Sequence, residues 1–487
     1  MFWEDHHMRR TKIVCTIGPA TNSEERLEAL IKAGMNVARL NFSHGKQEDH
    51  AAVIERIRAL SARLGSPIAI LQDLQGPKIR VSSLQGGQPV KLVDGAMLTI
   101  TTKDIEGNEK IIPTTYEALP QDVQPGDRIL LDDGLLELRV LSTTDTDVVC
   151  QVVHGGMLKE HKGINLPGIA VSAPALTEKD RDDLKFGVAH GVDYVALSFV
   201  RRPEDVLEAK YLIRQFQMES KGKKAPEPIP LIVKLEKPEA VAHLDAILEV
   251  TDGVMVARGD LGVEMSLEKV PLIQKRVIAK CNELGLPVIT ATQMLESMVT
   301  NPSPTRAEVT DVSNAILDGT DAVMLSAETA AGSYPLEAVQ MMVRIALETE
   351  AEDRTAHQPQ HLWRTQAHAV SHAARALSEE ASVRAIVVFT RSGASAHLIS
   401  KDRPRVPILA YTPSEEVYRR LALWWGVWSY HSELQGTTEE LIDVVDQLLE
   451  EDKLIHKGEY VVIMGGLPIA SQARTNFVKL HCVGTNK

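Results

Sequence analysis

Eight short apolar segments, each followed by an amphipathic stretch, constrain the fold of this chain more than any other feature. They are nearly continuous in Val, Ile, Ala and Leu, as is typical of strands that are buried on both faces. The segments are Thr11–Gly18, Met35–Ser43, Ile68–Leu74, Tyr194–Val200, Leu231–Lys237, Gly253–Asp260, Pro287–Gln293 and Ala322–Thr329. Because strands that alternate with helices form parallel sheets, eight such pairs predict a (β/α)₈ barrel within an α/β fold.

The stretches between these segments predict helices with recognisable ends. Helices are expected over Glu24–Ala33, Glu48–Leu64, Glu178–His190, Pro203–Gln217 and Leu267–Leu284. Thr305 with Glu308, and more weakly Thr177 with Asp180, have the spacing of a capping box. Helices are expected to stop at Gly34, Gly285 and Gly319.

Two regions do not follow the barrel pattern and indicate further domains. Residues 1–75 and 175–350 hold the eight strand–helix pairs, and residues 76–174 between them have turn clusters and short alternating runs. This pattern predicts a small β domain inserted after the third barrel strand. Residues 355–487 alternate again, with a helix expected over Arg364–Leu377 and strands over Arg384–Thr390 and Tyr460–Met464. They predict a separate open α/β domain, which the polar linker Glu348–Gln360 would join to the barrel.

Composition excludes several classes of function. The formal net charge of −13 and the 4% of aromatic residues argue against a nucleic-acid surface. No apolar run approaches the ~20 residues of a membrane span, and the amino-terminal segment lacks the apolar stretch of a secretory signal. The four cysteines, Cys15, Cys150, Cys281 and Cys482, form no CxxC pair, so we expect neither a zinc site nor disulfides. A cytoplasmic protein is expected.

Polar residues gather where the predicted strands end, which is where barrel enzymes have their active sites. The candidates are Arg39, Asn41, Ser43, His44, Asp73, Lys234, Glu236, Gly259, Asp260, Thr292, Ser326 and Glu328. Lys234 and Glu236 are two residues apart on one strand and therefore share a face. Glu236 and Asp260 follow adjacent strands and fit Mg²⁺ (or Mn²⁺), which binds one or two carboxylates.

Structural interpretations of the same residues stand beside these functional ones. Lys234 and Glu236 could form a buried ion pair, although such pairs stabilise weakly. Thr292 could be a helix cap, and Gly262 could serve only a tight turn after Arg258. His243, His368 and His372 are expected to be surface or packing residues, and core or interface packing is the expected role of Trp424, Trp425 and Trp428.

Several motifs together resemble those of the pyruvate kinase family, in order and over nearly the whole chain. They are RLNFSHG (Arg39–Gly45), GPKIR (Gly76–Arg80), KGINLPG (Lys162–Gly168), VMVARGDLGVE (Val254–Glu264), ITATQMLESM (Ile289–Met298), the block Pro304–Gly332 and SGASA (Ser392–Ala396). The resemblance implies a cytoplasmic, homotetrameric, allosteric transferase of glycolysis. Its reaction would convert phosphoenolpyruvate and ADP to pyruvate and ATP.

The resemblance also implies roles for individual residues. Lys234 would stabilise the transferring phosphoryl group and Arg39 would clamp it, while Glu236 and Asp260 hold Mg²⁺. The backbone at Gly259 and Asp260, with Thr292, would receive the substrate carboxylate. The nucleotide side would be lined by Asn41, His44, Arg80 and Lys162. The enolate would be protonated by Thr292 or by a water near Ser326 and Glu328, and the inserted domain would act as a lid.

One departure from the family pattern concerns K⁺. Many members read TKGPEIR where this chain has Leu74–Arg80, so that Lys78 replaces an acid. By resemblance, the ion would be bound by Asn41, Ser43, Asp73 and the carbonyl of Leu74. Because an ammonium group can occupy the electrostatic role of a monovalent ion, we expect Lys78 to replace it and catalysis not to need K⁺.

An effector site is expected in the carboxyl-terminal domain. The segment with Thr390, Arg391, Ser392, Gly393 and Ser395 follows a strand and opens a helix, so it could hold a phosphate. The sequence resembles the bacterial members that respond to a sugar monophosphate or AMP. Two alternatives stay open: a Schiff-base aldolase built on Lys234, and a phosphosugar-sensing protein with an inactive barrel.

Overall fold

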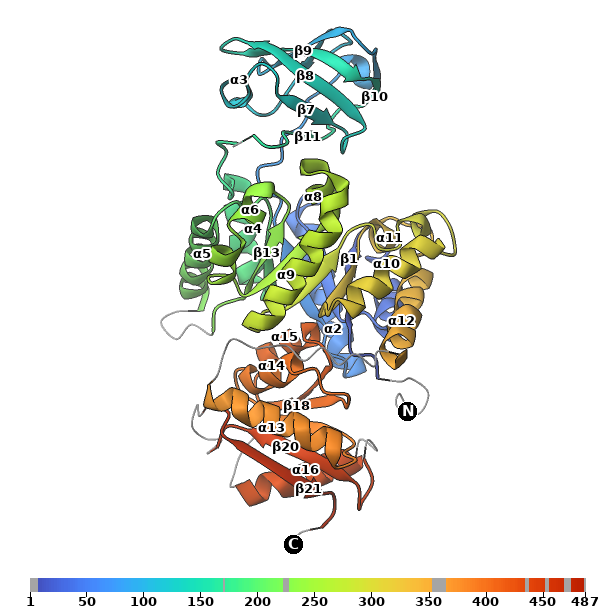
Figure 1. Cartoon of the computed structure of the whole chain (residues 1–487), viewed down its shortest axis with the longest axis vertical. Helices are drawn as coiled ribbons and strands as arrows, with labels where there is room; N and C mark the ends of the chain where they lie inside the picture. Colours follow the sequence, from blue (N-terminus) through green and yellow to red (C-terminus); the bar gives the residue numbers. More distant parts are fainter. Residues whose placement is uncertain are drawn as a thin grey trace.

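The computed structural model describes residues 8–169, 171–221, 227–352, 365–433, 438–451, 455–467 and 474–485. Three domains follow one another along the long axis of the molecule, with the barrel in the middle (Figure 1). Eight parallel strands close the barrel in the order β1-β16-β15-β14-β13-β12-β3-β2. They are β1 (Lys12–Ile17), β2 (Val37–Asn41), β3 (Ala69–Asp73), β12 (Tyr194–Leu197), β13 (Leu231–Leu235), β14 (Gly253–Ala257), β15 (Val288–Ala291) and β16 (Ala322–Leu325). The predicted barrel is confirmed.

Helices surround this barrel and cover its strands with apolar faces. They are α1 (Glu24–Ala33), α2 (Gln47–Leu64), α4 (Glu178–Ala189), α5 (Pro203–Lys221), α6 (Pro238–Ala242), α7 (Leu244–Leu248), α8 (Arg258–Glu264), α9 (Val270–Leu284), α10 (Arg306–Leu317), α11 (Ala327–Ala330) and α12 (Pro335–Glu352), with short 3₁₀ turns η2 (Leu267–Lys269) and η3 (Glu296–Val299). The two predicted capping boxes are confirmed at the starts of α4 and α10. Gly34 and Gly285 cap α1 and α9 as expected.

The inserted domain follows β3, and its strands pair antiparallel except for β5 and β6, which pair parallel. A six-stranded sheet has the order β11-β7-β8-β9-β5-β6, and a two-stranded sheet pairs β10 with β4. The elements are η1 (Gln85–Gly87), β4 (Val90–Leu92), β5 (Met97–Thr101), β6 (Ile111–Pro113), α3 (Leu119–Asp122), β7 (Arg128–Leu131), β8 (Leu136–Thr143), β9 (Asp147–His154), β10 (Gly156–Leu158) and β11 (Ile164–Asn165). This domain lies at one end of the molecule, beyond the barrel mouth (Figure 1).

The carboxyl-terminal domain has a five-stranded sheet in the order β19-β18-β17-β20-β21. Its elements are α13 (Gln366–Glu380), β17 (Ile386–Phe389), α14 (Ala394–Lys401), β18 (Ile408–Thr412), α15 (Glu415–Arg420), η4 (Leu421–Leu423), β19 (Val427–His431), α16 (Thr438–Glu451), β20 (Tyr460–Gly465) and β21 (Phe477–Cys482). Only β21 pairs antiparallel. Trp424 and Trp425 are buried between this domain and the barrel, so their expected packing role is confirmed.

Buried polar contacts attach this domain to the amino-terminal ends of the barrel strands, the face opposite the lid. Asp321, which is fully buried, binds Lys401 at 2.6 Å and Arg403 at 2.9 Å. Lys12 donates a hydrogen bond of 2.6 Å to the carbonyl of Val427. These contacts join the carboxyl-terminal domain to the barrel, which lies between the other two domains in Figure 1.

Two sequence-based expectations need correction. The segment Glu348–Gln360 was expected to be a linker, but α12 continues through Glu352. The reason is Glu350, whose buried carboxylate accepts hydrogen bonds from the backbone N–H groups of Arg10 and Thr11 at 2.8 and 2.6 Å. Residues 353–360, and Arg364 of the expected helix, lie outside the described residues. Gly262 was considered for a tight turn after Arg258, but it lies inside α8, which begins at Arg258 itself.

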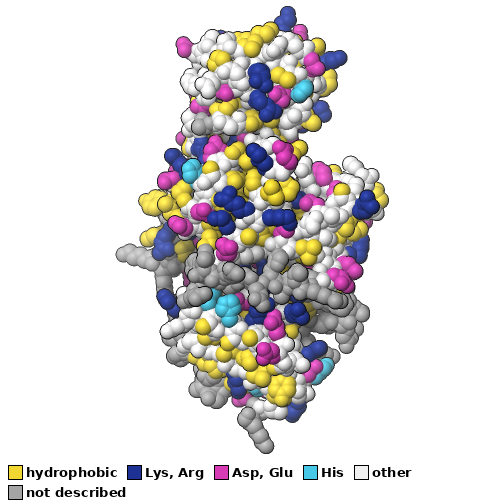
Figure 2. Space-filling model, in the orientation of Figure 1, with side chains coloured by type: hydrophobic (Ala, Val, Ile, Leu, Met, Phe, Trp, Pro, Cys, Tyr) yellow, Lys and Arg dark blue, Asp and Glu magenta, His cyan; other side chains and the backbone are white. Residues whose placement is uncertain are grey.

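The surface carries no continuous field of one charge on the side drawn in Figure 2, where basic and acidic side chains are mixed on all three domains. In the part of the chain that the structure describes, no helix is long and apolar enough to cross a membrane.

Candidate active site

The centre of the barrel mouth is a compact cluster around the Lys234 ammonium group. Lys234 Nζ lies 2.8 Å from Glu236 Oε1 and 3.2 Å from Asp73 Oδ1. It also donates a hydrogen bond of 2.8 Å to the Ser198 hydroxyl. Arg39 joins the cluster through its Nε, which lies 2.6 Å from Asp73 Oδ2. Three strands, β2, β3 and β13, therefore bring two cations and two carboxylates together, and β12 adds the hydroxyl of Ser198, because parallel strands end at one edge.

Burial and charge pairing together set the protonation of this cluster. Burial alone would lower the pKa of Lys234, but Asp73 and Glu236 outweigh it and the pKa lies above its usual value. Burial alone would raise the pKa of Asp73, but Lys234 and Arg39 outweigh it and the pKa lies below its usual value. Lys234 therefore keeps its positive charge at the mouth of the barrel.

Glu236 and Asp260 form the pair of carboxylates that a divalent cation needs. Glu236 is only 2% exposed, and its Oε2 accepts a hydrogen bond of 2.8 Å from the backbone N–H of Phe199. Burial raises the pKa of Glu236, and the negative charge of the half-buried Asp260 raises it further. Two carboxylates that repel each other at a barrel mouth fit Mg²⁺, which leaves its other positions to water and substrate oxygens. Within the described segments, no larger group of metal-ligating side chains occurs.

Thr292 lies where the carboxylate of a substrate was expected to bind. Its hydroxyl accepts a hydrogen bond of 2.7 Å from the backbone N–H of Gly259 and donates one of 2.7 Å to the carbonyl of Ala291. Its φ of 67° is in the left-handed region, which non-glycine residues rarely adopt. No helix begins there, so the interpretation of Thr292 as a helix cap is wrong. Arg258 supports this backbone through a hydrogen bond of 2.8 Å to the carbonyl of Thr292.

Glu328 is fully buried, and backbone groups occupy both of its oxygens. It accepts hydrogen bonds from the N–H groups of Leu295 at 3.1 Å and Ser326 at 2.7 Å. The hydroxyl of Ser326 is buried without a hydrogen-bond partner among the described residues. The structure thus brings the two residues together, with the hydroxyl of Ser326 as the unpaired group.

The residues expected on the nucleotide side lie where β2 meets the lid. His44 is exposed, but partial desolvation and then the positive charges of Arg80, Lys78 and Arg39 lower its pKa. Three cations therefore act on one position, as a polyanionic ligand would require. In the lid, Lys162 binds Asp132 at 2.8 Å, and Arg80 donates a hydrogen bond of 3.4 Å to the carbonyl of His161.

Three of the four groups expected to bind a monovalent cation, Asn41, Asp73 and the carbonyl of Leu74, are already paired with protein donors. The carbonyl of Leu74 accepts a hydrogen bond of 2.7 Å from the Ser198 hydroxyl, and Asn41 Oδ1 accepts one of 3.1 Å from the backbone N–H of Ser43. The side chain of Lys78 is exposed and forms no ion pair or hydrogen bond with the described residues. It faces the gap between barrel and lid that Asp260 also lines.

The expected effector segment forms a tight turn between β17 and α14. Thr390 Oγ1 accepts a hydrogen bond of 2.9 Å from the N–H of Gly393, whose φ is 89°. Ser392 is exposed, as is Arg391, and the Ser395 hydroxyl lies 2.7 Å from that of Thr475. Thr475, which follows β20 in the chain, is a neighbour that sequence reasoning missed, since no local pattern connects it with this turn.

Sequence reasoning placed Ser198 and Phe199 at the end of the fourth barrel strand but gave neither a role in the catalytic cluster. Phe199 has a φ of 55°, which turns its N–H toward Glu236. Gly76 makes room for it, because a Cβ at this position would lie 2.7 Å from the Phe199 ring. The only signal in the sequence was the position of both residues at the end of a strand.

The fold and the site define a class of protein: a (β/α)₈-barrel enzyme with an inserted β domain, whose mouth gathers two cations and several carboxylates. Comparison with known proteins makes this specific. Residues 8–339 match the barrel domain of pyruvate kinase, and residues 368–481 match its alpha/beta domain. The chain belongs to the pyruvate kinase family and is a phosphotransferase.

Individual relatives agree with this assignment. A pyruvate kinase of Staphylococcus saprophyticus is 49% identical over 487 residues, which cover 98% of this chain and 81% of the relative. A pyruvate kinase of Geobacillus stearothermophilus is 47% identical over 481 residues, which cover 98% of this chain and 80% of the relative. The crystal structure of a pyruvate kinase from Cryptosporidium parvum superposes with a TM-score of 0.91 at 39% identity, covering 98% of this chain and 96% of that one.

Proposed function

We propose that this chain transfers the phosphoryl group of phosphoenolpyruvate to ADP, giving pyruvate and ATP in glycolysis. The observation that carries the proposal is the Lys234 cluster, which keeps an obligatory positive charge at the barrel mouth between Arg39 and the carboxylates. Moving a phosphoryl group between two anions requires such charge, because at 4 Å and an effective dielectric near 20 the repulsion is about 4 kcal/mol. Lys234 stabilises the transferring group and Arg39 clamps it.

A divalent cation, Mg²⁺ or Mn²⁺, would be held by Glu236 and Asp260. When bound, it would supply further positive charge to the phosphoryl oxygens. The substrate carboxylate binds at the start of α8, where the backbone of Gly259 and Asp260 and the hydroxyl of Thr292 lie together. These groups orient the substrate so that its phosphoryl group points to Lys234.

The nucleotide binds on the lid side, where Asn41 and His44 line the barrel edge and Arg80 and Lys162 approach from the inserted domain. Closure of the lid excludes water before transfer. Protonation of the enolate then involves Thr292 or a water held near Ser326 and Glu328. Both oxygens of Glu328 already accept backbone hydrogen bonds, whereas the Ser326 hydroxyl has no partner among the described residues. A water bound to the Ser326 hydroxyl is therefore the favoured proton donor.

The Schiff-base alternative conflicts with the electrostatics of Lys234. A nucleophilic amine must lose its proton, and an aldolase lysine is therefore expected to have a lowered pKa. Here the neighbouring carboxylates raise the pKa of Lys234 instead. A phosphosugar sensor with an inactive barrel is disfavoured because the cluster of Lys234, Glu236, Asp260 and Thr292 is intact.

Catalysis is proposed to proceed without K⁺, with Lys78 supplying a permanent charge near the nucleotide side. In support, the charge of Lys78 acts on His44, which follows Asn41 and Ser43. A sugar monophosphate or AMP is proposed as the effector, bound by the turn that holds Thr390, Ser392 and Gly393.

The protein is also proposed to be a cytoplasmic homotetramer, on the basis of its resemblance to the family.

A coupled assay for pyruvate tests the proposed reaction. Phosphoenolpyruvate, ADP and Mg²⁺ are supplied together, and each is then omitted in turn. Turnover that needs all three supports the proposal. Absence of pyruvate under every effector condition refutes it, and borohydride trapping of a carbonyl substrate on Lys234 would favour the aldolase.

A further inference from the structure

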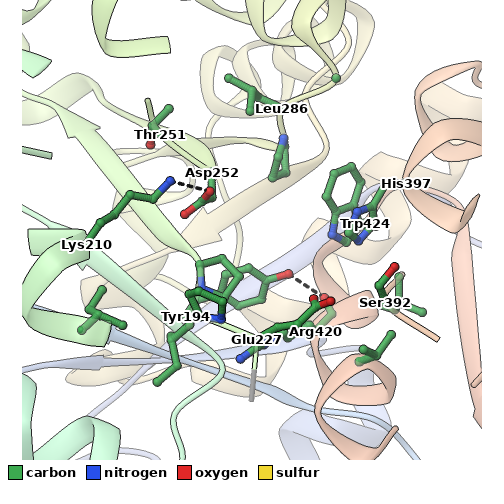
Figure 3. Close-up of a pocket in the computed structure, with 18 of the residues that line it drawn as sticks. Tyr194, Lys210, Glu227, Thr251, Asp252, Leu286, Ser392, His397, Arg420 and Trp424 are labelled. Atoms are coloured by element: carbon green, nitrogen blue, oxygen red, sulfur yellow. Dashed lines mark hydrogen bonds and ion pairs between the residues drawn. The ribbon is translucent and has the colours of Figure 1, made fainter. Parts of the chain in front are cut away.

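A cavity of about 600 Å³ lies on the side of the barrel opposite the mouth, between the barrel and the carboxyl-terminal domain (Figure 3). Helix α5 and the segments that lead into β13, β14 and β15 form its barrel wall. Helices α14 and α15 and the turn η4 form its other wall. Sites for small molecules commonly have this size and lie between domains, which makes the cavity a candidate site.

One wall of the cavity is aromatic. The rings of His397 and Trp424 are stacked, with centroids 3.7 Å apart and an interplanar angle of 12°. Burial, helped by the charges of Lys401 and Arg420, lowers the pKa of His397 to about 3. His397 is therefore neutral at physiological pH, and the stacked pair acts as an apolar surface. Such a surface accepts a flat ring.

Across from this pair, the barrel contributes both apolar and charged side chains. Ile213, Ile229 and Leu286 line the cavity there. Lys210 and Asp252 bind each other at 2.7 Å, as the dashed line in Figure 3 shows. Their charges are thus compensated within the protein.

Three charged residues that line the cavity form no ion pair with the described residues: the exposed Glu227 and Arg214, and the half-buried Arg420. The two arginines outnumber the glutamate, and the more buried of them is Arg420. Its backbone is fixed, because the Tyr194 hydroxyl donates a hydrogen bond of 2.7 Å to its carbonyl. Its guanidinium has no hydrogen bond or ion pair with the described residues, and its Nε is buried. Arg214 lines the same cavity and also has no such partner among them. A buried donor without an acceptor is costly, and an anion in the cavity would remove that cost.

We propose that this cavity binds a small anion built on a flat apolar ring, with its negative group at Arg420 and its ring against the His397–Trp424 pair. An isolated inorganic anion would leave most of the volume and the aromatic wall unused. A neutral ring would leave the guanidinium without a partner. Ser392 alone is shared between the cavity and the proposed effector turn, where Thr390 and Ser395 bond to other residues.

Isothermal titration of the full chain with phenyl phosphate tests this inference, with inorganic phosphate and phenol as comparison ligands at constant ionic strength. Phenyl phosphate is expected to bind at least tenfold more tightly than either comparison ligand. Arg420→Met is expected to weaken its binding at least tenfold. Arg405→Met is the matched control, because it removes an exposed arginine outside the cavity and should change nothing.

Two further variants keep the test decisive. Leu286→Trp fills the cavity from the barrel side and should abolish binding even if the Arg420 variant does not fold. Thr390→Val alters the effector turn and should leave phenyl phosphate binding unchanged. Equal binding by wild type and Arg420→Met, or no preference over inorganic phosphate, overturns the inference. So does loss of binding in Thr390→Val with retention in Arg420→Met, which would place the probe in the effector turn.

Discussion

Replacing Lys234 with Met gives the sharpest test of the catalytic cluster. The substitution keeps the length of the side chain and removes a charge that lies 2.8 Å from Glu236 and 3.2 Å from Asp73. A unit charge 4 Å from the transferring phosphoryl group contributes about 4 kcal/mol at an effective dielectric of 20. This corresponds to about 10³ in rate, and a well-placed cation in phosphoryl transfer can reach ~10⁵. We therefore expect turnover to fall by ~10³–10⁵-fold.

The same substitution also affects stability, and the two effects must be separated. Removing one partner of a buried pair costs about 3–5 kcal/mol. Here we expect the lower end, because Arg39 still pairs with Asp73 and the N–H of Phe199 still binds Glu236. Thermal unfolding measures this loss, and the fold should persist.

Lys237→Met is the matched control for this experiment. Lys237 is buried like Lys234 and is paired with Glu264 at 2.6 Å, so its loss should destabilise the protein to a similar extent. It should lower turnover less than tenfold. Pyruvate formation under saturating substrates is the assay. If Lys234→Met kept more than a tenth of wild-type turnover, or if both variants lost the same activity, Lys234 would not be the phosphoryl stabiliser.

Three further predictions concern the ion, the effector and pH. Activity in K⁺-free buffer with tetramethylammonium should equal activity in K⁺, and Lys78→Glu should lower it; a tenfold fall that K⁺ restores would contradict the first expectation. Ser392→Glu should abolish activation by sugar monophosphates, because a carboxylate repels phosphate at this turn, and unchanged activation would place the effector elsewhere. Burial lowers the pKa of His397 from 6.5 to about 3. As the pH falls from 6.5 toward 3, the unfolded chain takes up a proton at this histidine before the folded chain does. The contribution of neutral His397 to stability is therefore present above pH 6.5 and is lost over this range. At about 1.4 kcal/mol per pH unit, melting temperatures between about pH 7 and about pH 5 should fall less in His397→Gln than in wild type, and equal falls would refute the assignment.

Local sequence patterns determined the barrel and most of its candidate site. Eight apolar runs specified parallel strands, since only strands buried on both faces need such composition. Lys234, Glu236 and Asp260 lie near the carboxyl ends of their strands. Because all strands of the closed barrel are parallel, these ends lie at the same mouth. The spacing of Lys234 and Glu236 put both on one face, and their observed ion pair of 2.8 Å agrees with that expectation.

Other features depended on contacts between distant segments and could not be read from local patterns. The polar composition around Glu350 indicated a linker. In the structure this segment is the end of α12, because Glu350 accepts hydrogen bonds from the backbone N–H groups just before β1. Thr292 and Phe199 adopt positive φ values because surrounding groups hold their backbones, which residue type does not reveal. The guanidinium of Arg420 has no hydrogen bond or ion pair among the described residues, and this depends on the packing of the barrel against the carboxyl-terminal domain, which is far from it in sequence. The periodicity of apolar residues indicates which face of a helix or strand is buried. Whether a buried charged side chain has an ion-pair partner depends instead on tertiary packing.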